Sequence, residues 1–319
     1  MGRSSGPKAL AAVVAVSLAL GACARLSAGG SGGFIDHPTG PADLVLRVEV
    51  VGGFRPATAV LRDVPPFTLV GNGRVIAPGP QVLVYPGPAL PNLQVREVTE
   101  AGVQRILRAA RDAGLMGPDR HYDYPLVADA ATTRFVLVAG GERHVVSAYA
   151  LGEEAFGEDL GAPTGMESPA GAERAPGLSE EERGARRRLA RFRDRLLDLG
   201  RWLPPGSVGE ERPYEPAGLR VFVTPDLPVE DPALRQRPLD WPLPEPLAGL
   251  GRPLEGLPEV RCAVVSGEDL QALRPLLERA TELTPWRSGG RTFGLAFRPL
   301  LPDESGCPAA VPGYGGAGP

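Results

Sequence analysis

The sequence is poor in lysine, isoleucine, asparagine and histidine. Lys8 is its only lysine, and isoleucine, asparagine and histidine occur three, two and three times. Because no lysine follows position 8, a Ser-x-x-Lys catalytic pair is excluded from the rest of the chain. Arginine, alanine, glycine and proline are abundant instead, which is the bias that GC-rich codons produce. The high arginine content therefore carries little functional information.

The chain also lacks the spacings that bind metals and phosphates. It contains no His-x-x-x-His, His-Glu or Cys-x-x-Cys pattern, so a zinc site is not supported. The one Gly-x-Ser-x-Gly match, Gly29 to Gly33, has no strand before it and no helix after it, as a nucleophile elbow requires. Gly140-Gly141 is expected in a hairpin turn and does not lead into a helix, so a dinucleotide cradle is not indicated. We expect no cofactor.

The charge balance is mildly acidic. Lys and Arg number 34 against 38 Asp and Glu, a formal net charge of −4. This balance argues against general affinity for nucleic acid or anionic lipid. A hydrophobic content of 43% is typical of a globular protein, and 42 glycines with 36 prolines imply long loops.

The N-terminus reads as an export signal. Arg3 and Lys8 precede an apolar run, residues 9–20, which is too short to cross a bilayer of about 30 Å. Cys23 follows Leu20-Gly21-Ala22, and this arrangement resembles the lipobox of bacterial lipoproteins. The resemblance implies cleavage before Cys23 and acylation of its thiol, by palmitate or a similar chain. An ordinary secretory signal with a chance cysteine is the alternative.

The two other cysteines form an even pair in an exported chain. Export places Cys262 and Cys307 in an oxidising compartment, which predicts a disulfide between them. In the chain-entropy account such a bridge contributes about 4 kcal/mol to stability. Two free buried thiols are the alternative.

The fold class is expected to be α+β, with antiparallel sheets, a few packed helices and two units joined by Pro/Gly-rich segments. The expected segments are a signal peptide (1–22), a flexible tether (23–42), an α+β domain (43–152), a linker (153–177), an amphipathic helix (178–200), a Pro-rich segment (201–258), a small α+β unit (259–307) and a loose tail (308–319).

The first domain is predicted from hairpin and cap signals. Strands are expected at 44–51, 81–85 and 93–98, and hairpins at 67–76 and 133–149. Asn72-Gly73 favours a type I′ turn in the first hairpin, because both residues tolerate positive φ. Thr99 is expected to cap a helix that ends at Gly114.

The rest of the chain offers one strong helix and a second strand-helix pattern. Ser179 and Glu182 form a capping box before an apolar stripe that runs to Leu199, and this helix is expected to dock on the first sheet. Strands are expected at 219–224, 259–265 and 291–297, with a helix after Ser266 that Pro275 interrupts or kinks.

Few residues are candidates for chemistry. His121 and Asp123 could form an acid–base pair, the alternative being an aromatic loop that packs beside a helix end. Ser266 lies where a strand meets a helix, as a nucleophile would, but a capping role is sufficient explanation. His37 is expected in a solvated loop and His144 at a sheet edge.

Two further groups of residues have a functional and a structural interpretation. Arg186 to Arg188 with Arg191, Arg193 and Arg195 form a basic patch, either an anion site or a solvated face paired with acids of the same helix. Trp202, Trp241 and Trp286 either line a groove for sugars or peptides or pack under the Pro-rich loops.

The lipobox, with residues 67–76, 128–135, 146–151 and 291–293, resembles a group of secreted lipoproteins from high-GC bacteria that has no assigned activity. The resemblance implies lipidation of Cys23 and no other functional residue. We therefore expect a non-enzymatic binding or envelope-associated lipoprotein on the extracytoplasmic face of the cell membrane, with the lipid bilayer as partner and no nucleic acid. The alternatives are a hydrolase of cell-wall or peptide substrates and a solute-binding lipoprotein.

Overall fold

The computed structural model describes residues 1–2, 33–124, 127–153, 178–225, 229 and 231–310. Residues Phe34–Pro319 form one compact unit. Of the other unit, Met1–Gly33, only Met1, Gly2 and Gly33 are described. Residues 3–22 of the expected signal peptide, Cys23 and residues 154–177 of the expected linker therefore lie outside the described residues.

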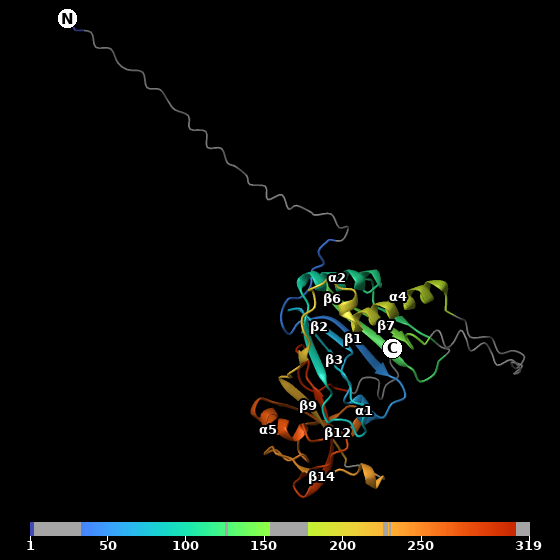
Figure 1. The fold of residues 1–319 in the computed structure, drawn as a ribbon, viewed down its shortest axis with the longest axis vertical. Helices are drawn as coiled ribbons and strands as arrows, with labels where there is room; N and C mark the ends of the chain where they lie inside the picture. The colour runs from blue at the N-terminus through green and yellow to red at the C-terminus, as the bar shows by residue number, and fades with distance from the viewer. Residues whose placement is uncertain (3–32, 125–126, 154–177, 226–228, 230, 311–319) are drawn as a thin grey trace, which may run out of the picture. The chain divides into compact units, whose positions relative to one another are not determined.

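One sheet has eight strands, in the order β5-β7-β6-β1-β2-β3-β4-β8. Figure 1 labels β1, β2, β3, β6 and β7 of this sheet. The strands are β1 (Leu44–Gly52), β2 (Phe67–Val70), β3 (Arg74–Pro78), β4 (Leu93–Glu97), β5 (Arg120–Tyr122), β6 (Ala131–Ala139), β7 (Glu142–Tyr149) and β8 (Arg212–Pro213). All neighbouring pairs are antiparallel except β5 with β7.

Two helices, α2 (Glu100–Asp112) and α4 (Glu180–Leu197), cover one face of this sheet and share a core with it. Thr99 caps α2 by accepting a hydrogen bond from the Gly102 amide, and Ser179 and Glu182 form the predicted capping box of α4. The shared core contains Leu46, Val48, Phe135 and Leu137 from the strands, Val103, Ile106 and Leu107 from α2, and Leu189, Phe192 and Leu196 from α4. As the sequence predicted, α4 docks on the first sheet.

The second sheet has six strands, in the order β10-β13-β14-β9-β12-β11. They are β9 (Gly218–Pro225), β10 (Leu239–Asp240), β11 (Arg252–Leu254), β12 (Leu257–Ser266), β13 (Trp286–Ser288) and β14 (Arg291–Pro299). Only β10 and β13 pair in parallel among these strands. Two antiparallel-rich sheets with packed helices confirm the α+β class.

Each face of the second sheet is covered by a different element. On one face, Leu270, Leu273 and Leu277 of α5 (Gly267–Leu277) pack in a core that includes Trp286 and Phe297. On the other face, Phe222 and Cys262 form a core with Leu61, which follows the short helix α1 (Ala57–Val60). In the sequence α1 and Leu61 lie between β1 and β2, two strands of the first sheet. A connection within the first sheet therefore covers this face of the second sheet.

The second sheet begins earlier than the sequence indicated. It was expected at 259–307, after a Pro-rich connection at 201–258, but β9, one of its central strands, lies at Gly218–Pro225. Leu219, Val221 and Val223 of β9 face the α5 core, and Phe222 faces the opposite one. This alternating burial holds β9 in the sheet despite the prolines around it. Both sheets lie within the compact unit Phe34–Pro319.

One of the two hairpin turns differs from expectation. Gly140 and Gly141 both have positive φ, 63° and 78°, as a tight two-residue hairpin turn requires. At 72–73 only Gly73 has positive φ, 81°, so the expected type I′ geometry is wrong there. Gly71 lies against Gly40, and a Cβ on Gly71 would come within 2.6 Å of the Gly40 carbonyl oxygen. The turn between Val70 and Arg74 thus has three residues, of which Gly71 leaves no room for a side chain.

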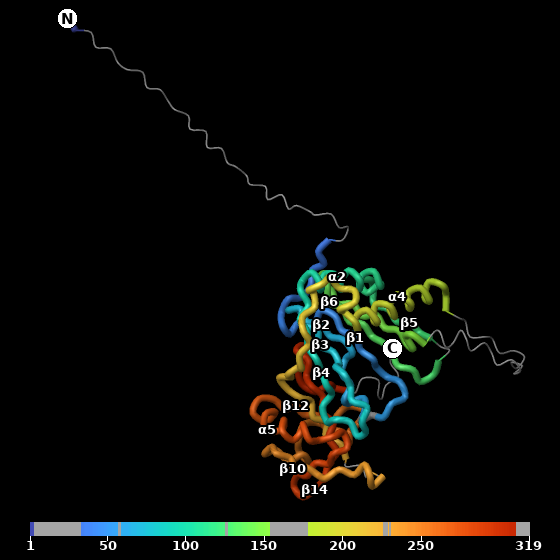
Figure 2. Tube along the Cα trace, in the orientation of Figure 1, coloured from blue at the N-terminus to red at the C-terminus, as the bar shows by residue number. Residues whose placement is uncertain are grey.

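The strand expected at 81–85 does not form. The four side chains Val82 to Tyr85 are exposed, and prolines at 80 and 86 remove amide donors at both ends of the segment. In Figure 2 this loop (cyan) lies beside the segment around α5 (orange). There the Ala89 amide donates to the Ala280 carbonyl oxygen at 3.0 Å, and the Gly87 amide donates to Glu282 Oε1 at 2.8 Å.

Candidate functional site

The structure does not bring His121 and Asp123 together as an acid–base pair. His121 is exposed on β5, and its Nδ1 lies 2.9 Å from the hydroxyl oxygen of Ser147. Asp123 Oδ1 instead accepts a hydrogen bond from the amide of Tyr124 at 2.8 Å. Tyr124 is buried, in line with the alternative of an aromatic loop.

The other two histidines are held by structural contacts. His37 is buried, so the expectation of a solvated loop residue is wrong. Its Nδ1 lies 2.7 Å from the Pro38 carbonyl oxygen, and its Nε2 lies 3.2 Å from a Glu100 carboxylate oxygen. His144 Nδ1 lies 3.0 Å from the carbonyl oxygen of Gly117.

Ser266 stands at the N-cap position of α5 with an extended backbone. Its hydroxyl makes no capping hydrogen bond, so the expected capping contact is absent at this described residue. All three histidines contact other residues, and none lies beside Ser266 as a base. The next residue, Gly267, has a φ of 58°, and this left-handed backbone turns the chain into the helix.

The basic patch on α4 is not a uniform solvated face. Arg186 is fully buried, contrary to that expectation, and it donates to four backbone carbonyl oxygens at 2.7 to 3.3 Å. Its guanidinium also lies over the Tyr124 ring, 5.1 Å from the centroid. Arg187 pairs with Glu180 on the surface at 2.9 Å, as expected of a solvated helix face.

The tryptophans serve packing. Trp286 is completely buried and makes edge-to-face contacts with Trp241 and Phe297, with ring centroids 6.0 and 5.5 Å apart. Trp202 donates its indole N–H to the Arg195 carbonyl oxygen at 2.7 Å. The structure therefore favours packing over a sugar-binding groove.

The predicted disulfide is present. Cys262 on β12 is bonded to Cys307, and their Cα atoms lie 5.9 Å apart. The bridge ties the segment after β14, which carries Asp303 and Glu304, to the second sheet. It packs in the same core as Phe222.

No group of three or more His, Cys, Asp or Glu side chains that could hold a metal occurs among the residues that the structure describes. Within that same part of the chain, no helix is both long and apolar enough to span a bilayer.

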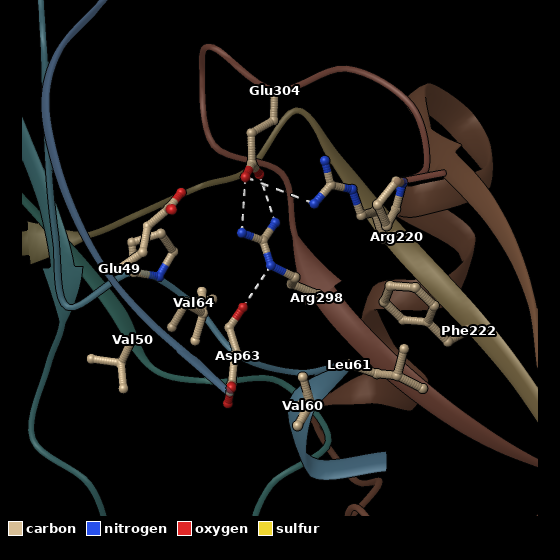
Figure 3. A pocket seen from close by; sticks show the side chains of 13 residues that line it. Glu49, Val50, Val60, Leu61, Asp63, Val64, Arg220, Phe222, Arg298 and Glu304 are labelled. Atoms are coloured by element: carbon tan, nitrogen blue, oxygen red, sulfur yellow. Dashed lines mark hydrogen bonds and ion pairs between the residues drawn. The ribbon is translucent and has the colours of Figure 1, made fainter. Parts of the chain in front are cut away.

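A cavity of about 140 Å³ lies where the two sheets meet, and it is the strongest candidate site (Figure 3). Its walls come from five parts of the chain: the end of β1, the end of α1 with the segment after it, the strand β9, the strand β14, and the chain before and after Cys307. The lining residues are Glu49, Val50, Val51, Val60, Leu61, Asp63, Val64, Pro65, Arg220, Phe222, Arg298, Glu304 and Pro308.

The alternation of side chains along β1 explains why polar groups reach this junction. Leu46 and Val48 belong to the core beneath α2 and α4, so Arg47 and Glu49 leave on the opposite face. There Arg47 donates to Asp303 Oδ1 at 2.6 Å. Glu49, two residues further along, lines the cavity.

Arg298 and Glu304 form the best-connected ion pair of the cavity. Arg298 donates both terminal nitrogens to the two carboxylate oxygens of Glu304, at 2.6 and 2.9 Å. Its Nε donates to the Asp63 carbonyl oxygen at 2.6 Å, which attaches the segment after α1 to β14. The dashed lines in Figure 3 show these contacts. Both side chains are about nine-tenths buried, at 10% and 11% exposed.

The charges fix the protonation state of Glu304. Burial alone would raise the pKa of its carboxyl group, but the hydrogen bonds and positive charge of Arg298, helped by Arg220, lower the pKa below its ordinary value. At neighbouring Tyr214 the effect of burial prevails and raises the pKa to about 12. The Tyr214 hydroxyl donates to the Leu300 carbonyl oxygen at 2.8 Å.

Arg220 differs from Arg298 in its hydrogen bonding. Its Nε donates to the Gly306 carbonyl oxygen at 2.8 Å, whereas Nη1 lies 3.7 Å from Glu304 Oε1, beyond hydrogen-bond distance. Among the described residues, its two terminal nitrogens have no hydrogen-bond acceptor. Its side chain is only 13% exposed, and burial lowers its pKa. An arginine fork with free donors at a cavity wall is suited to bind an anion.

A second, larger cavity of about 350 Å³ lies beside the exposed loop, lined in part by Arg62, Tyr85 and Glu282. Its two charged groups satisfy each other, because Arg62 Nη1 donates to Glu282 Oε2 at 2.6 Å. The smaller cavity is therefore the better candidate for specific recognition.

None of the cavity's polar residues was singled out from the sequence. Arg220 lies in the strand expected at 219–224, and Arg298 directly follows the strand expected at 291–297. In an alternating strand pattern an arginine is expected to face the solvent. Glu304 lies in a loop with no motif around it. The one available signal was the disulfide, which predicted that the segment carrying Glu304 is held against β12.

Comparisons of the chain with protein-family models, with curated proteins and with solved structures give no significant match.

Proposed function

We propose that this protein is an extracytoplasmic lipoprotein, anchored through Cys23, whose folded part binds a small ligand in the cavity between the two sheets. The observation that carries the binding role is Arg220, a largely buried guanidinium that lines the cavity and whose terminal nitrogens have no acceptor among the described residues. Donors at a cavity wall that have no acceptor are available to an anionic ligand.

The proposed location rests on the sequence pattern at the N-terminus. A basic start, a short apolar run and Leu20-Gly21-Ala22-Cys23 support export and lipidation. Two or three acyl chains on one cysteine give a stable attachment, since each buried CH₂ group contributes about 0.8 kcal/mol.

The cavity's contacts favour binding over hydrolysis. Its three carboxylates are each held by an arginine: Glu49 by Arg134, Asp63 by Arg55, and Glu304 by Arg298. An arginine donor thus already occupies each of these carboxylates. The solute-binding alternative shares the cavity with our proposal, whereas no contact of His121 or Asp123 favours the hydrolase.

The anchor is tested by expressing the full chain in a bacterium that processes lipoproteins. We expect the mature protein to begin at an acylated Cys23, to fractionate with membranes, and to accumulate as precursor when lipoprotein signal peptidase is inhibited. Cys23→Ala abolishes acylation in this account. A wild-type protein that carries no fatty acid contradicts the anchor.

The binding role is tested by filling the cavity. Val64→Phe places a ring in the cavity, and Val82→Phe, in the exposed loop, is the matched control. We expect a set of small fragment compounds to include some that raise the melting temperature of wild type and of Val82→Phe but not of Val64→Phe. Equal responses from all three proteins, or none from wild type, contradict binding at this cavity.

A further inference from the structure

We infer that the ligand of this cavity is a monoanion: a carboxylate that carries a compact apolar group. This inference rests on the proposed binding function and specifies its ligand. Three features of the cavity, namely its charge balance, the free donors of Arg220 and its apolar walls, point to this class.

The charge balance calls for one more negative charge. Among the residues that the structure describes, Arg47, Arg220 and Arg298 meet two carboxylates, those of Asp303 and Glu304, within one connected and largely buried network. The cavity's other two carboxylates, Glu49 and Asp63, are each balanced by an arginine outside this network. The network therefore holds one more positive charge than negative, although Arg220 itself lies 3.7 Å from Glu304. A single carboxylate compensates this positive charge without adding excess negative charge.

The free donors belong to Arg220, whose nearest carboxylate is farther away than those of the other two arginines. Arg47 and Arg298 donate to carboxylates at 2.6 Å, whereas Arg220 reaches Glu304 only at 3.7 Å. Its Nε is fixed by the Gly306 carbonyl oxygen, so the guanidinium is held in place while both Nη atoms remain available. A carboxylate matches two such parallel donors.

The remaining wall is apolar and small. Val50, Val60, Leu61, Val64 and Phe222 face the cavity beside the charged groups (Figure 3). Its volume of about 140 Å³ is close to the roughly 150 Å³ known to accommodate benzene. A carboxylate with a branched or cyclic group of about four to six carbon atoms matches this space.

Glu49 sets the orientation. Its carboxylate lines the cavity and belongs to β1, whereas Arg220 belongs to β9 (Figure 3). Because like charges repel, the ligand's carboxylate binds at Arg220 and its apolar group lies toward Val50 and Leu61.

The experiment uses the full chain in detergent and isothermal titration with isovalerate and its neutral isostere isovaleramide. We expect isovalerate to bind at least about tenfold more tightly than the amide, since charge-assisted hydrogen bonds are about twice as strong as neutral ones. Arg220→Gln removes this preference. Arg212→Gln is the control, because Arg212 is an exposed strand arginine that pairs with Glu97 at 2.8 Å, and it leaves both affinities unchanged.

The outcomes separate the ligand class from the binding function. Equal binding of acid and amide overturns the monoanion and leaves a binding cavity, whereas failure of both compounds, together with no fragment that depends on Val64, removes the proposed function as well. Sulfate binding as tightly as isovalerate overturns the apolar requirement. The comparison of acid with amide on wild type requires no variant, so it stands even where Arg220→Gln does not fold.

Two sources could supply this chemistry, a free acid or the carboxyl end of a peptide. N-acetyl-leucine and N-acetyl-leucinamide form the second pair of probes. Tighter binding of N-acetyl-leucine than of isovalerate identifies a peptide end, and the reverse order identifies a free acid. Either order supports the monoanion, provided that each acid binds more tightly than its amide.

Discussion

Arg298 and Glu304 form a bidentate ion pair, with nitrogen–oxygen distances of 2.6 and 2.9 Å. The two residues are only six positions apart in the sequence. The pair closes the loop that follows β14, and Glu304 within it also lies 3.8 Å from Arg47 of the first sheet. A short local contact thus supports the junction between two sheets whose strands lie far apart in sequence.

Removing the charge of Glu304 is expected to destabilise the protein markedly. Glu304→Gln leaves Arg47, Arg220 and Arg298 with Asp303 as their only carboxylate. We expect the free energy of unfolding to fall by about 3 kcal/mol, as for other buried ion pairs that lose one partner. Urea unfolding followed by circular dichroism measures this. Glu210→Gln, at an exposed position, changes it by less than about 0.5 kcal/mol. A similar small change for Glu304→Gln would show that the pair is structurally dispensable.

The same carboxylate predicts a pH dependence of stability. The pKa of Glu304 is lowered in the folded state from its ordinary value of 4.5, by the hydrogen bonds and charge of Arg298 acting against burial. A lowered carboxyl pKa stabilises the fold above the unfolded-state value, and this stabilisation is lost as the pH falls through the folded-state value. The free energy of unfolding should therefore decline below about pH 4.5, with a shallower decline in Glu304→Gln. Parallel declines in the two proteins would assign the acid sensitivity to other carboxyl groups.

Local patterns predicted most secondary-structure elements because their signals are local. The capping box at Ser179 and Glu182, the Thr99 cap and the strand at 219–224 all depend on residues that are close in sequence. The prediction of a strand at 81–85 was wrong because a local pattern says nothing about distant partners. The apolar residues of this segment suit a strand, but forming one requires a neighbouring strand that the sequence does not reveal.

The candidate site could not be predicted in this way because it depends on contacts between distant segments. Arg47 and Asp303 are 256 residues apart, and no spacing relates them. Arg186 shows the same difficulty: it lies three residues before Leu189, at the border of an apolar helix stripe, so the helix pattern alone does not decide whether it is buried.

The disulfide is expected to stabilise both the fold and the cavity. Replacing Cys262 and Cys307 together by serine removes a bridge across 45 residues, for which the loop-entropy account gives about 4 kcal/mol. We also expect weaker isovalerate binding in the double variant, because the segment that carries Glu304 and Gly306 loses its covalent attachment to β12. Calorimetric melting and titration measure the two effects. A double variant as stable as wild type would show that the surrounding packing already holds this segment.

Two neighbouring arginines on α4 should lose very different amounts of stability on the same substitution. Arg186 is fully buried and donates to carbonyl oxygens of Tyr122 and Tyr149, among others, whereas Arg187 pairs with Glu180 at the surface. Arg186→Met leaves buried carbonyl groups without donors, and we expect a loss of about 3 kcal/mol in the free energy of unfolding. Arg187→Met removes only an exposed ion pair and costs less than about 0.5 kcal/mol. Chemical unfolding of both variants measures the contrast. Equal, small effects would mean that α4 docks through its apolar stripe alone, and that the ends of β5 and β7 do not depend on the guanidinium between them.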